Sequence, residues 1–195
     1  MDCHHIEKFL TYIFERIDLR RDLHFYTKTS IDTLDYSGDA INEGSKLVLA
    51  AYGDKLRTLA TSVPEELKGG RLIMPGVVMI PFSVFTEHSK AKKEIAEFCA
   101  SIKKATELGG IVQIVLHDEF EFGMDVLKDY LWITYTRSNP SHDIYGVEEF
   151  VENKHWGCNG AMIIDARKKP HHAPELIMDA AVSKKAEEIL KRSVS

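Results

Sequence analysis

Apolar positions near the start of the chain recur with helical spacing. Between residues 4 and 20 they are Ile6, Phe9, Leu10, Ile13, Phe14 and Ile17. This spacing, close to i, i+3, i+4, i+7, predicts an amphipathic helix over residues 4–20. A second periodic segment predicts a helix over residues 89–108, with Ser89 as its N-cap and Gly109-Gly110 as its stop. The end of the chain predicts a helix over residues 182–193.

Continuous apolar runs predict buried strands between these helices. They are "SKLVLAAYGD" (45–54), "GIVQIVLHDE" (110–119), "WITYT" (132–136, directly after the helical "MDVLKDYLWI") and "GAMIIDAR" (160–167). The β-rich start of "LHFYTKTSIDTLDYSG" (23–38) predicts one more strand. An apolar strand that follows a helix is typical of a parallel βαβ unit covered on both faces. The alternation predicts an α/β fold, a layered sandwich with a mixed, largely parallel sheet flanked by helices, as a single domain over 1–195.

The segment "RLIMPGVVMIPFSVF" (71–85) is long and apolar but contains Pro75 and Pro81. Proline lacks the N–H that a central strand donates, so this segment predicts a strand with a bulge or at an edge. It is also our candidate for an exposed apolar interface patch.

Composition narrows the class of protein. The chain has 195 residues and a formal net charge of −5, which does not favour a nucleic-acid partner. No apolar run approaches the roughly 18–20 residues of a membrane span, and the polar N-terminus does not resemble a signal peptide. The odd number of cysteines (Cys3, Cys99 and Cys158) is typical of reduced thiols, and we expect a cytoplasmic protein.

The first polar cluster is "YTRSNPSHDIYG" (135–146). Asn139-Pro140 predicts a turn, because the residue before proline avoids the α region. Arg137 offers a planar fork for a carboxylate or phosphate, and Thr136 adds a hydroxyl. The structural alternative is that Arg137 pairs with Asp143 or Asp165 and joins two loops.

The second cluster, "NKHWGCNG" (153–160), brings together Lys154, His155 and Trp156 on a segment that its glycines predict to be a loop. A tryptophan on such a loop can form the wall of an aromatic pocket, or it can cap the core. His155 and Cys158 have a His-x-x-Cys spacing, but no second pair of metal ligands follows at a matching interval. The same two residues could form a nucleophile and base, although no orienting acid is evident.

Two further segments have alternative interpretations. "DARKKPHHAP" (165–174), with Lys168 and Lys169, predicts either an anion site or a solvated loop. In "TKTSIDTLDYSG" (27–38), the spacing of Asp32 and Asp35 is explained by local side-chain to backbone hydrogen bonds. The sequence has no glycine-rich phosphate loop and no Gly-x-Ser-x-Gly motif.

Three segments in order give the chain a resemblance to a known family. They are "TLDYSGDAINEGSK", "IVLHDEFEFGMDVLKDYLWITYTRSNPSHDIYG" and "HWGCNGAMIIDARKKPHHAP". Together they resemble the C-terminal domain of the UbiD-like decarboxylases, enzymes that use prenylated FMN to add or remove carboxyl groups on aromatic and unsaturated acids. The resemblance runs from about residue 24 to residue 179. The N-terminal flavin domain of that family, with its Glu-Arg-Glu catalytic set and its metal ligands, has no counterpart here, so no catalytic or metal residue is carried over.

The resemblance implies a subunit or half of a split carboxy-lyase that acts on a small aromatic or unsaturated acid. This chain alone would bind no cofactor, and prenylated FMN would lie on a flavin-binding partner subunit. Lys154, His155 and Trp156, with Arg137 and Thr136, would contribute to the substrate pocket. The chain would also supply an oligomer interface, and we expect a homo-oligomer. The alternative is a non-catalytic assembly or small-acid-binding module.

Overall fold

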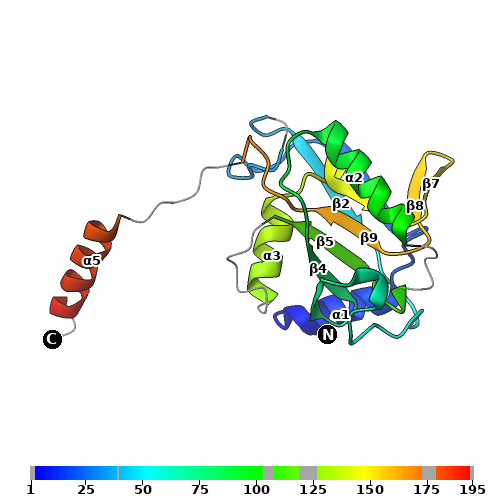
Figure 1. Cartoon of the computed structure of the whole chain (residues 1–195), viewed down its shortest axis with the longest axis horizontal. Helices are drawn as coiled ribbons and strands as arrows, with labels where there is room; N and C mark the ends of the chain where they lie inside the picture. Colours follow the sequence, from blue (N-terminus) through cyan, green and yellow to red (C-terminus); the bar gives the residue numbers. More distant parts are fainter. Residues whose placement is uncertain (1–2, 39, 103–107, 119–126, 173–178, 194–195) are drawn as a thin grey trace.

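The computed structural model describes residues 3–38, 40–102, 108–118, 127–172 and 179–193. Its elements, in chain order, are α1 (Ile6–Arg16), β1 (Leu23–Thr29), β2 (Gly44–Leu49), the 3₁₀ turn η1 (Glu65–Leu67), β3 (Arg71–Met74), β4 (Val77–Pro81), α2 (His88–Ser101), β5 (Gln113–His117), α3 (Leu127–Thr136), α4 (Pro140–Asp143), β6 (Ile144–Gly146), β7 (Glu149–Glu152), β8 (His155–Cys158), β9 (Met162–Asp165) and α5 (Ala180–Ser193). Figure 1 shows their arrangement.

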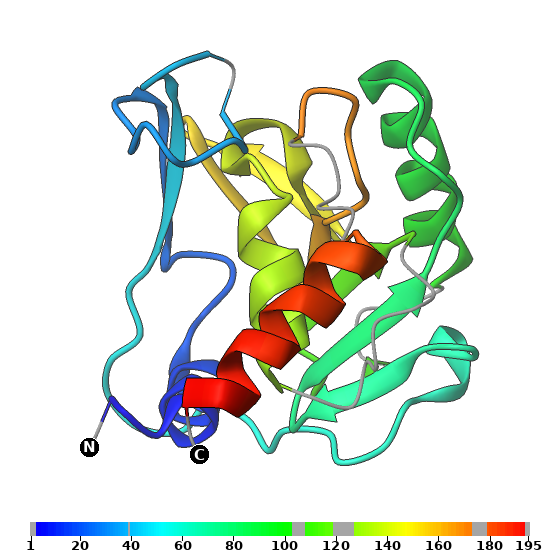
Figure 2. The same ribbon diagram turned by 90° about the vertical axis from the view of Figure 1, so that its left-hand side faces the viewer.

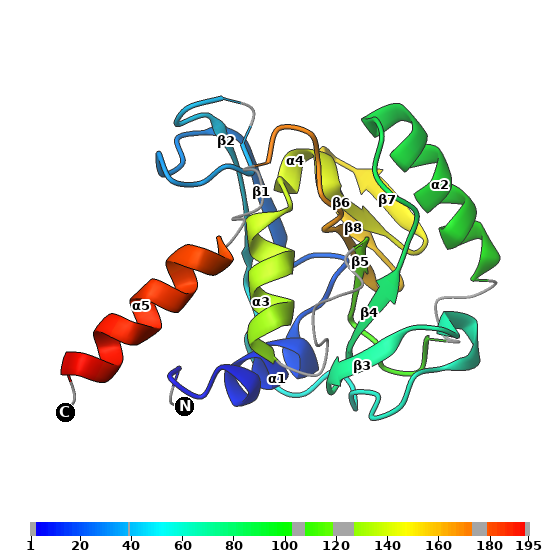
Figure 3. The same ribbon diagram turned by 60° about the vertical axis from the view of Figure 1, so that its left-hand side comes forward.

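A five-stranded mixed sheet organises the fold, in the order β3-β4-β5-β9-β6. The three central strands β4, β5 and β9 are parallel, and the strands at both edges are antiparallel to their neighbours. Helices lie on both sides of this sheet, and Figure 3 shows α3 and α2 on opposite faces. The predicted α/β sandwich with a mixed sheet is therefore confirmed.

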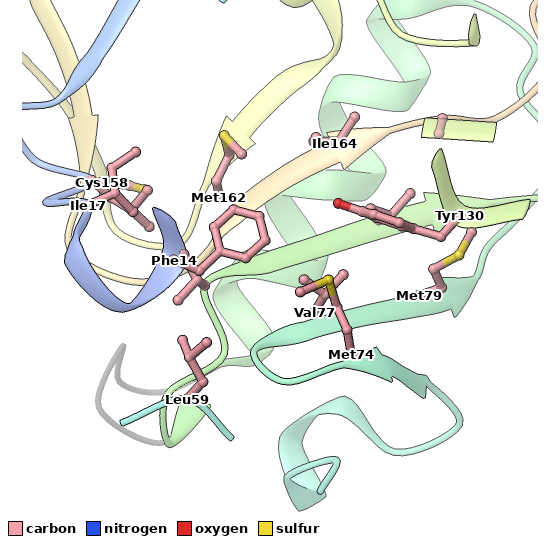
Figure 4. Close-up of a cluster of buried hydrophobic side chains, with 14 of the residues drawn as sticks. Phe14, Ile17, Leu59, Met74, Val77, Met79, Tyr130, Cys158, Met162 and Ile164 are labelled. Carbon is pink, nitrogen blue, oxygen red and sulfur yellow. The ribbon is translucent and has the colours of Figure 1, made fainter. Parts of the chain in front are cut away.

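The central strands are apolar on both faces because each face is covered. Val77 and Met79 of β4 join the core beneath α1 and α3, whereas Val78 and Ile80 join a second core beneath α2. Figure 4 shows the first core, in which Phe14 and Tyr130 are both almost fully buried. Each completely buried side chain of this size contributes roughly 1.5–3 kcal/mol. The two cores hold the sheet as a rigid platform.

The prediction for segment 71–85 is correct only in part. β3 is an edge strand, and its register with β4 shifts between Leu72 and Met74, as expected for a bulge. The segment nevertheless forms two strands, because Pro75-Gly76 turns the chain and Gly76 takes a φ of +80°. β4 lies inside the sheet, and the buried stretch 77–80 cannot be an exposed interface patch.

Two further predictions, one of a strand and one of a helix cap, also need correction. "WITYT" is not a strand, because α3 continues through it to Thr136 and directs Tyr130, Ile133 and Thr134 into the core. In α2 the N-cap is Glu87, and the Ser89 hydroxyl donates to the Glu87 carboxylate instead of capping the helix. α2 ends at Ser101, and residues 103–107 of the predicted helix lie outside the described residues.

Two antiparallel hairpins, β1–β2 and β7–β8, stand outside the main sheet. In Figure 2 the β1–β2 hairpin and α2 lie on opposite sides of α3. The C-terminal helix α5 is confirmed, stands apart from the layers in Figure 1 and exposes Val182, Ile189 and Leu190. Within the described ranges, none of the helices has the length and apolar character needed to cross a membrane.

Candidate functional site

A pocket of about 730 Å³ lies between the two hairpins and α4. Its lining residues are Leu23, His24, Phe25, Tyr26, Thr27, Pro140, Ser141, Ile144, Val151, Lys154, His155 and Trp156. This volume is within the range of small-molecule sites, roughly 300–1,000 Å³. Three of the five predicted site residues, Lys154, His155 and Trp156, are therefore together in one pocket.

The segment predicted as a loop at 153–160 is instead the turn and second strand of the β7–β8 hairpin. Asn153 and Lys154 form its two-residue turn, with φ values of 50° and 65°. Positive φ at both positions is the signature of the type I′ turn, whose twist matches that of a hairpin. The turn places the exposed side chain of Lys154 at the pocket.

Trp156 forms the aromatic wall of the pocket together with Phe25 of β1. Their ring centroids are 5.4 Å apart and their planes meet at 82°, an edge-to-face contact. Gly146 makes room for the indole, because a Cβ atom there would lie 3.2 Å from Cζ2 of Trp156. Trp156 is only half-buried, so it both packs against the core and lines the pocket.

His155 is held by the backbone of the segment that follows α1. Its Nε2 atom lies 3.1 Å from the carbonyl oxygen of Arg20, which can only accept, so Nε2 carries the hydrogen. In that tautomer Nδ1 is the acceptor. The ring of His24 has its centroid 6.1 Å away. Both imidazoles line the pocket.

The other two predicted site residues do not line this pocket. The Thr136 hydroxyl donates to the carbonyl oxygen of Trp132, 2.6 Å away, at the end of α3. Arg137 is half-buried, and its carbonyl oxygen accepts a 2.8 Å hydrogen bond from Nζ of Lys169. The two aspartates suggested as partners of Arg137 form ion pairs with other residues. Asp165 pairs with Arg167, and Asp143 pairs with Lys169.

The wall opposite the hairpin is α4, whose position depends on Ser45. Asn139-Pro140 was predicted to form a turn, but it begins a helix. Asn139 is the N-cap of α4, and Pro140 occupies the first helical position. The Ser45 hydroxyl donates to Oδ1 of Asn139 and accepts from the N–H of Ser141 at 2.8 Å. Sequence reasoning identified the Asn-Pro signal but missed Ser45, because nothing local indicates a contact with a residue 94 positions away.

A buried charge network lies at the carboxyl ends of β4, β5 and β9. Arg167 is fully buried and donates to both carboxylate oxygens of Asp165, at 2.8 Å each, and to Glu94 at 2.9 Å. Lys169, also buried, lies 3.2 Å from Asp143 at the end of α4. The sequence predicted that Lys169 lies in an anion site or in a solvated loop, and neither prediction is correct. The buried Lys169 side chain instead connects β9 to α4, the helix that lines the pocket.

Charge within the pocket is one-sided. Lys154 is the only residue with a permanent charge among the described lining residues, and none of them is acidic. The rest of the lining combines aromatic and aliphatic side chains with hydroxyls and imidazoles. The site therefore suits a planar, apolar body that carries an anionic or hydrogen-bonding substituent.

The arrangement does not support Cys158 as a nucleophile with His155 as its base. Residues three apart on a strand point to opposite faces, and Cys158 lies outside this pocket. Burial raises the pKa of its thiol to about 12, and the thiol donates to the carbonyl oxygen of Gly160. Within the described ranges there is no group of three or more His, Cys, Asp or Glu that could hold a metal ion.

The described lining of this pocket offers few donors for a flavin phosphate. A flavin phosphate needs several converging donors, whereas this pocket offers one lysine on an exposed turn, and the N–H of Ser141 in α4 is already bonded to Ser45. The arrangement suits binding and orientation of a small molecule.

Comparisons with known proteins agree with the resemblance found in the sequence. The family model of the 3-octaprenyl-4-hydroxybenzoate carboxy-lyase C-terminal domain matches residues 1–51. A 4-hydroxybenzoate decarboxylase subunit of Chlamydia pneumoniae is 31% identical over 183 residues, which cover 92% of this chain and 30% of that protein. An uncharacterised protein of Chlamydia trachomatis serovar D is 27% identical over 185 residues, which cover 93% of this chain and 30% of that protein. The chain thus spans about 30% of the length of these relatives.

Among solved structures, the vanillic acid decarboxylase of Sedimentibacter hydroxybenzoicus in its open form can be aligned with this chain. The alignment covers 62% of this chain and 27% of the decarboxylase chain. The identity is 20% and the TM-score 0.35, a likeness too low to support any argument. The family model and the relative from Chlamydia pneumoniae confirm the resemblance: this chain is similar to the C-terminal domain of the UbiD-like decarboxylases.

Proposed function

We propose that this chain supplies one wall of the substrate pocket of a UbiD-like carboxy-lyase that acts on an aromatic or unsaturated carboxylic acid. The observation that carries the proposal is the pocket in which Trp156 and Phe25 form an aromatic wall beside Lys154, with no acidic residue in the described lining. The relative from Chlamydia pneumoniae, a 4-hydroxybenzoate decarboxylase subunit, supports the same class of substrate.

The chain binds and orients, and the reacting groups lie elsewhere. The planar body of the acid packs against Trp156, Lys154 pairs with an anionic or polar substituent, and Nδ1 of His155 accepts a hydrogen bond from a hydroxyl. Prenylated FMN, held by a flavin-binding partner subunit, would supply the electron sink for carboxyl transfer. The hairpins would exclude water from the substrate.

The partner subunit and a homo-oligomer remain predictions. Because the relative from Chlamydia pneumoniae is one subunit of a decarboxylase, a multi-subunit enzyme is the assembly that it supports. A pull-down with this chain from native lysate, followed by size exclusion and an absorbance spectrum, tests both. A flavin-bearing partner at fixed stoichiometry supports the proposal, and a colourless homo-oligomer without a partner contradicts it.

The alternative is a module that binds a small acid without taking part in chemistry. It is favoured by one observation, that the described lining of the pocket has no carboxylate or thiol that could act as a general acid, base or nucleophile. Titration of the isolated chain with 4-hydroxybenzoate, together with a decarboxylation assay of the co-purified complex, separates the two functions. Binding without activity in any complex favours the module. Activity that depends on the complex and falls at least tenfold in Trp156→Ala favours the enzyme.

A further inference from the structure

A second pocket, of about 570 Å³, lies at the amino ends of the parallel strands. Its lining residues come from four segments: Asp18, Leu19, Arg20; Leu56, Arg57, Thr58; Leu108, Gly109, Gly110, Ile111, Val112; and Cys158, Asn159, Gly160. It shares no lining residue with the pocket at Trp156. Its role is therefore a separate question from the proposed substrate wall.

Two of the three arginines near this pocket are neutralised by neighbouring aspartates. Nε and Nη2 of Arg20 donate to the two carboxylate oxygens of Asp18, at 2.9 and 2.8 Å. These hydrogen bonds lower the pKa of Asp18 to about 2, so the carboxylate stays ionised. Arg21, outside the lining, is paired in the same way with Asp22 at 2.7 Å. Neither pair leaves charge for a ligand.

Arg57 is the exception. Its Nη1 donates to the carbonyl oxygens of Phe14 and Ile17, at 2.8 and 2.6 Å, where α1 ends. Over the described part of the chain, Arg57 has no ion pair with a carboxylate, and its Nε and Nη2 make no hydrogen bond. It is half-buried, and this burial lowers the pKa of the guanidinium. A partly desolvated cation with two uncommitted donor atoms therefore lines the pocket.

We propose that this pocket binds a small oxyanion, a carboxylate or a phosphate group, through Nε and Nη2 of Arg57. The guanidinium offers the planar fork that matches such anions, and Nη1 fixes its orientation in advance through the end of α1. Leu56, Leu108 and Val112 provide apolar contacts for the body of a larger ligand. The only acidic residue in the described lining, Asp18, is already occupied by Arg20.

The test is titration of the whole chain with inorganic phosphate and, separately, with acetate, at constant ionic strength and with chloride as the reference anion. Binding is followed by amide chemical shifts. We expect saturable shifts at Gly109, Gly110 and Asn159, and not at Trp156. Tighter binding of phosphate would assign a phosphate ligand, and tighter binding of acetate a carboxylate.

Variants with matched charge give the decisive comparison. Arg57→Gln and Arg21→Gln each remove one positive charge, but only Arg57 lines the pocket. We expect at least a tenfold loss of affinity in Arg57→Gln and less than a twofold change in Arg21→Gln. Because Arg57 also contacts the end of α1, Asn159→Asp is a second variant: it adds a negative charge at an exposed lining position and should weaken binding to the same extent. Absence of saturable binding, or affinity unchanged in Asn159→Asp, would overturn the proposal.

Discussion

The indole of Trp156 stands edge-on to the ring of Phe25, with centroids 5.4 Å apart, and this contact joins the β7–β8 hairpin to the β1–β2 hairpin. The two hairpins share no backbone ladder, since each is a separate two-stranded sheet. Side-chain packing therefore fixes the width of the candidate pocket. The pocket should respond to changes in these side chains more than to changes in the main sheet.

Trp156 should report ligand binding by fluorescence. The chain has two tryptophans, and Trp132 is 60% exposed whereas Trp156 is half-buried. In Trp132→Phe the remaining emission should have a shorter wavelength maximum than in Trp156→Phe, and an aromatic acid should quench it. Quenching that persists in Trp156→Phe would place the ligand elsewhere.

Lys154→Gly should stabilise the fold while weakening the pocket. Lys154 has a φ of 65°, a conformation that costs a non-glycine residue about 1 kcal/mol. Glycine there completes the preferred Asn-Gly sequence of a type I′ turn, so we expect about 0.5–1 kcal/mol of added stability in urea unfolding. The same variant should bind 4-hydroxybenzoate at least fivefold more weakly. Equal affinity would show that the lysine does not contact the ligand.

Gly146→Ala should disrupt the packing of β8. A Cβ at Gly146 would lie 2.4 Å from Cβ of Cys158, too close for two carbon atoms. Gly146 is held by its pairing with Met162 of β9, and Cys158 by its pairing with Glu149 of β7. We expect a loss of about 3 kcal/mol in chemical denaturation. Gly53→Ala is the control, because its Cβ meets nothing within 4 Å and only the φ of +81° costs about 1 kcal/mol. Equal losses in the two variants would contradict this account.

Arg167→Met should be among the most damaging single changes in the chain. It leaves Asp165, which is fully buried, without the guanidinium that donates to both of its oxygens. Removal of one partner of a buried ion pair typically costs about 3–5 kcal/mol. Lys68→Met removes an exposed pair with Glu65 and should have no measurable effect on urea unfolding.

Stability should fall in mild acid because of His172. Burial, with the positive charges of Lys169, His171, Arg137 and Lys168, lowers the pKa of His172 from 6.5 to about 4. Its Nδ1 accepts a hydrogen bond from the N–H of Lys169, which requires the neutral ring. The unfolded chain binds this proton more readily, so the stabilising contribution is complete above pH 6.5 and is lost as the pH falls toward about 4. The pH dependence of unfolding over this window should become shallower in His172→Gln.

Sequence patterns predicted the sheet and its flanking helices where one period dominated. The continuous apolar runs around Val115 and Ile163 identified β5 and β9, because strands covered on both faces need no polar positions. The pattern failed at "WITYT", where β-branched and aromatic residues favour a strand. There the packing of Tyr130, Ile133 and Thr134 at helical spacing against the sheet decides the conformation.

The candidate site was predicted only where its residues are adjacent in sequence. Lys154, His155 and Trp156 were found together, yet their glycines suggested a loop. Gly157 is instead a strand residue, where a Cβ would lie 2.8 Å from the carbonyl oxygen of Arg20 and 2.9 Å from the ring of Phe150. Phe25, which lines the pocket, and Ser45, which holds α4 in place, come from distant segments and give no local signal at all.

The separation of the two hairpins from the five-stranded sheet has an evolutionary consequence. Leu23, Phe25 and Trp156 line the pocket and also pack in the first core, whereas the lining residues Tyr26 and Val151 belong to neither core. Substitutions at exposed lining positions such as Tyr26 and Val151 can therefore accumulate without a stability threshold being crossed. Among descendants of this chain, ligand preference should diverge faster than the fold. Gly146, Asp165 and Arg167 should remain unchanged.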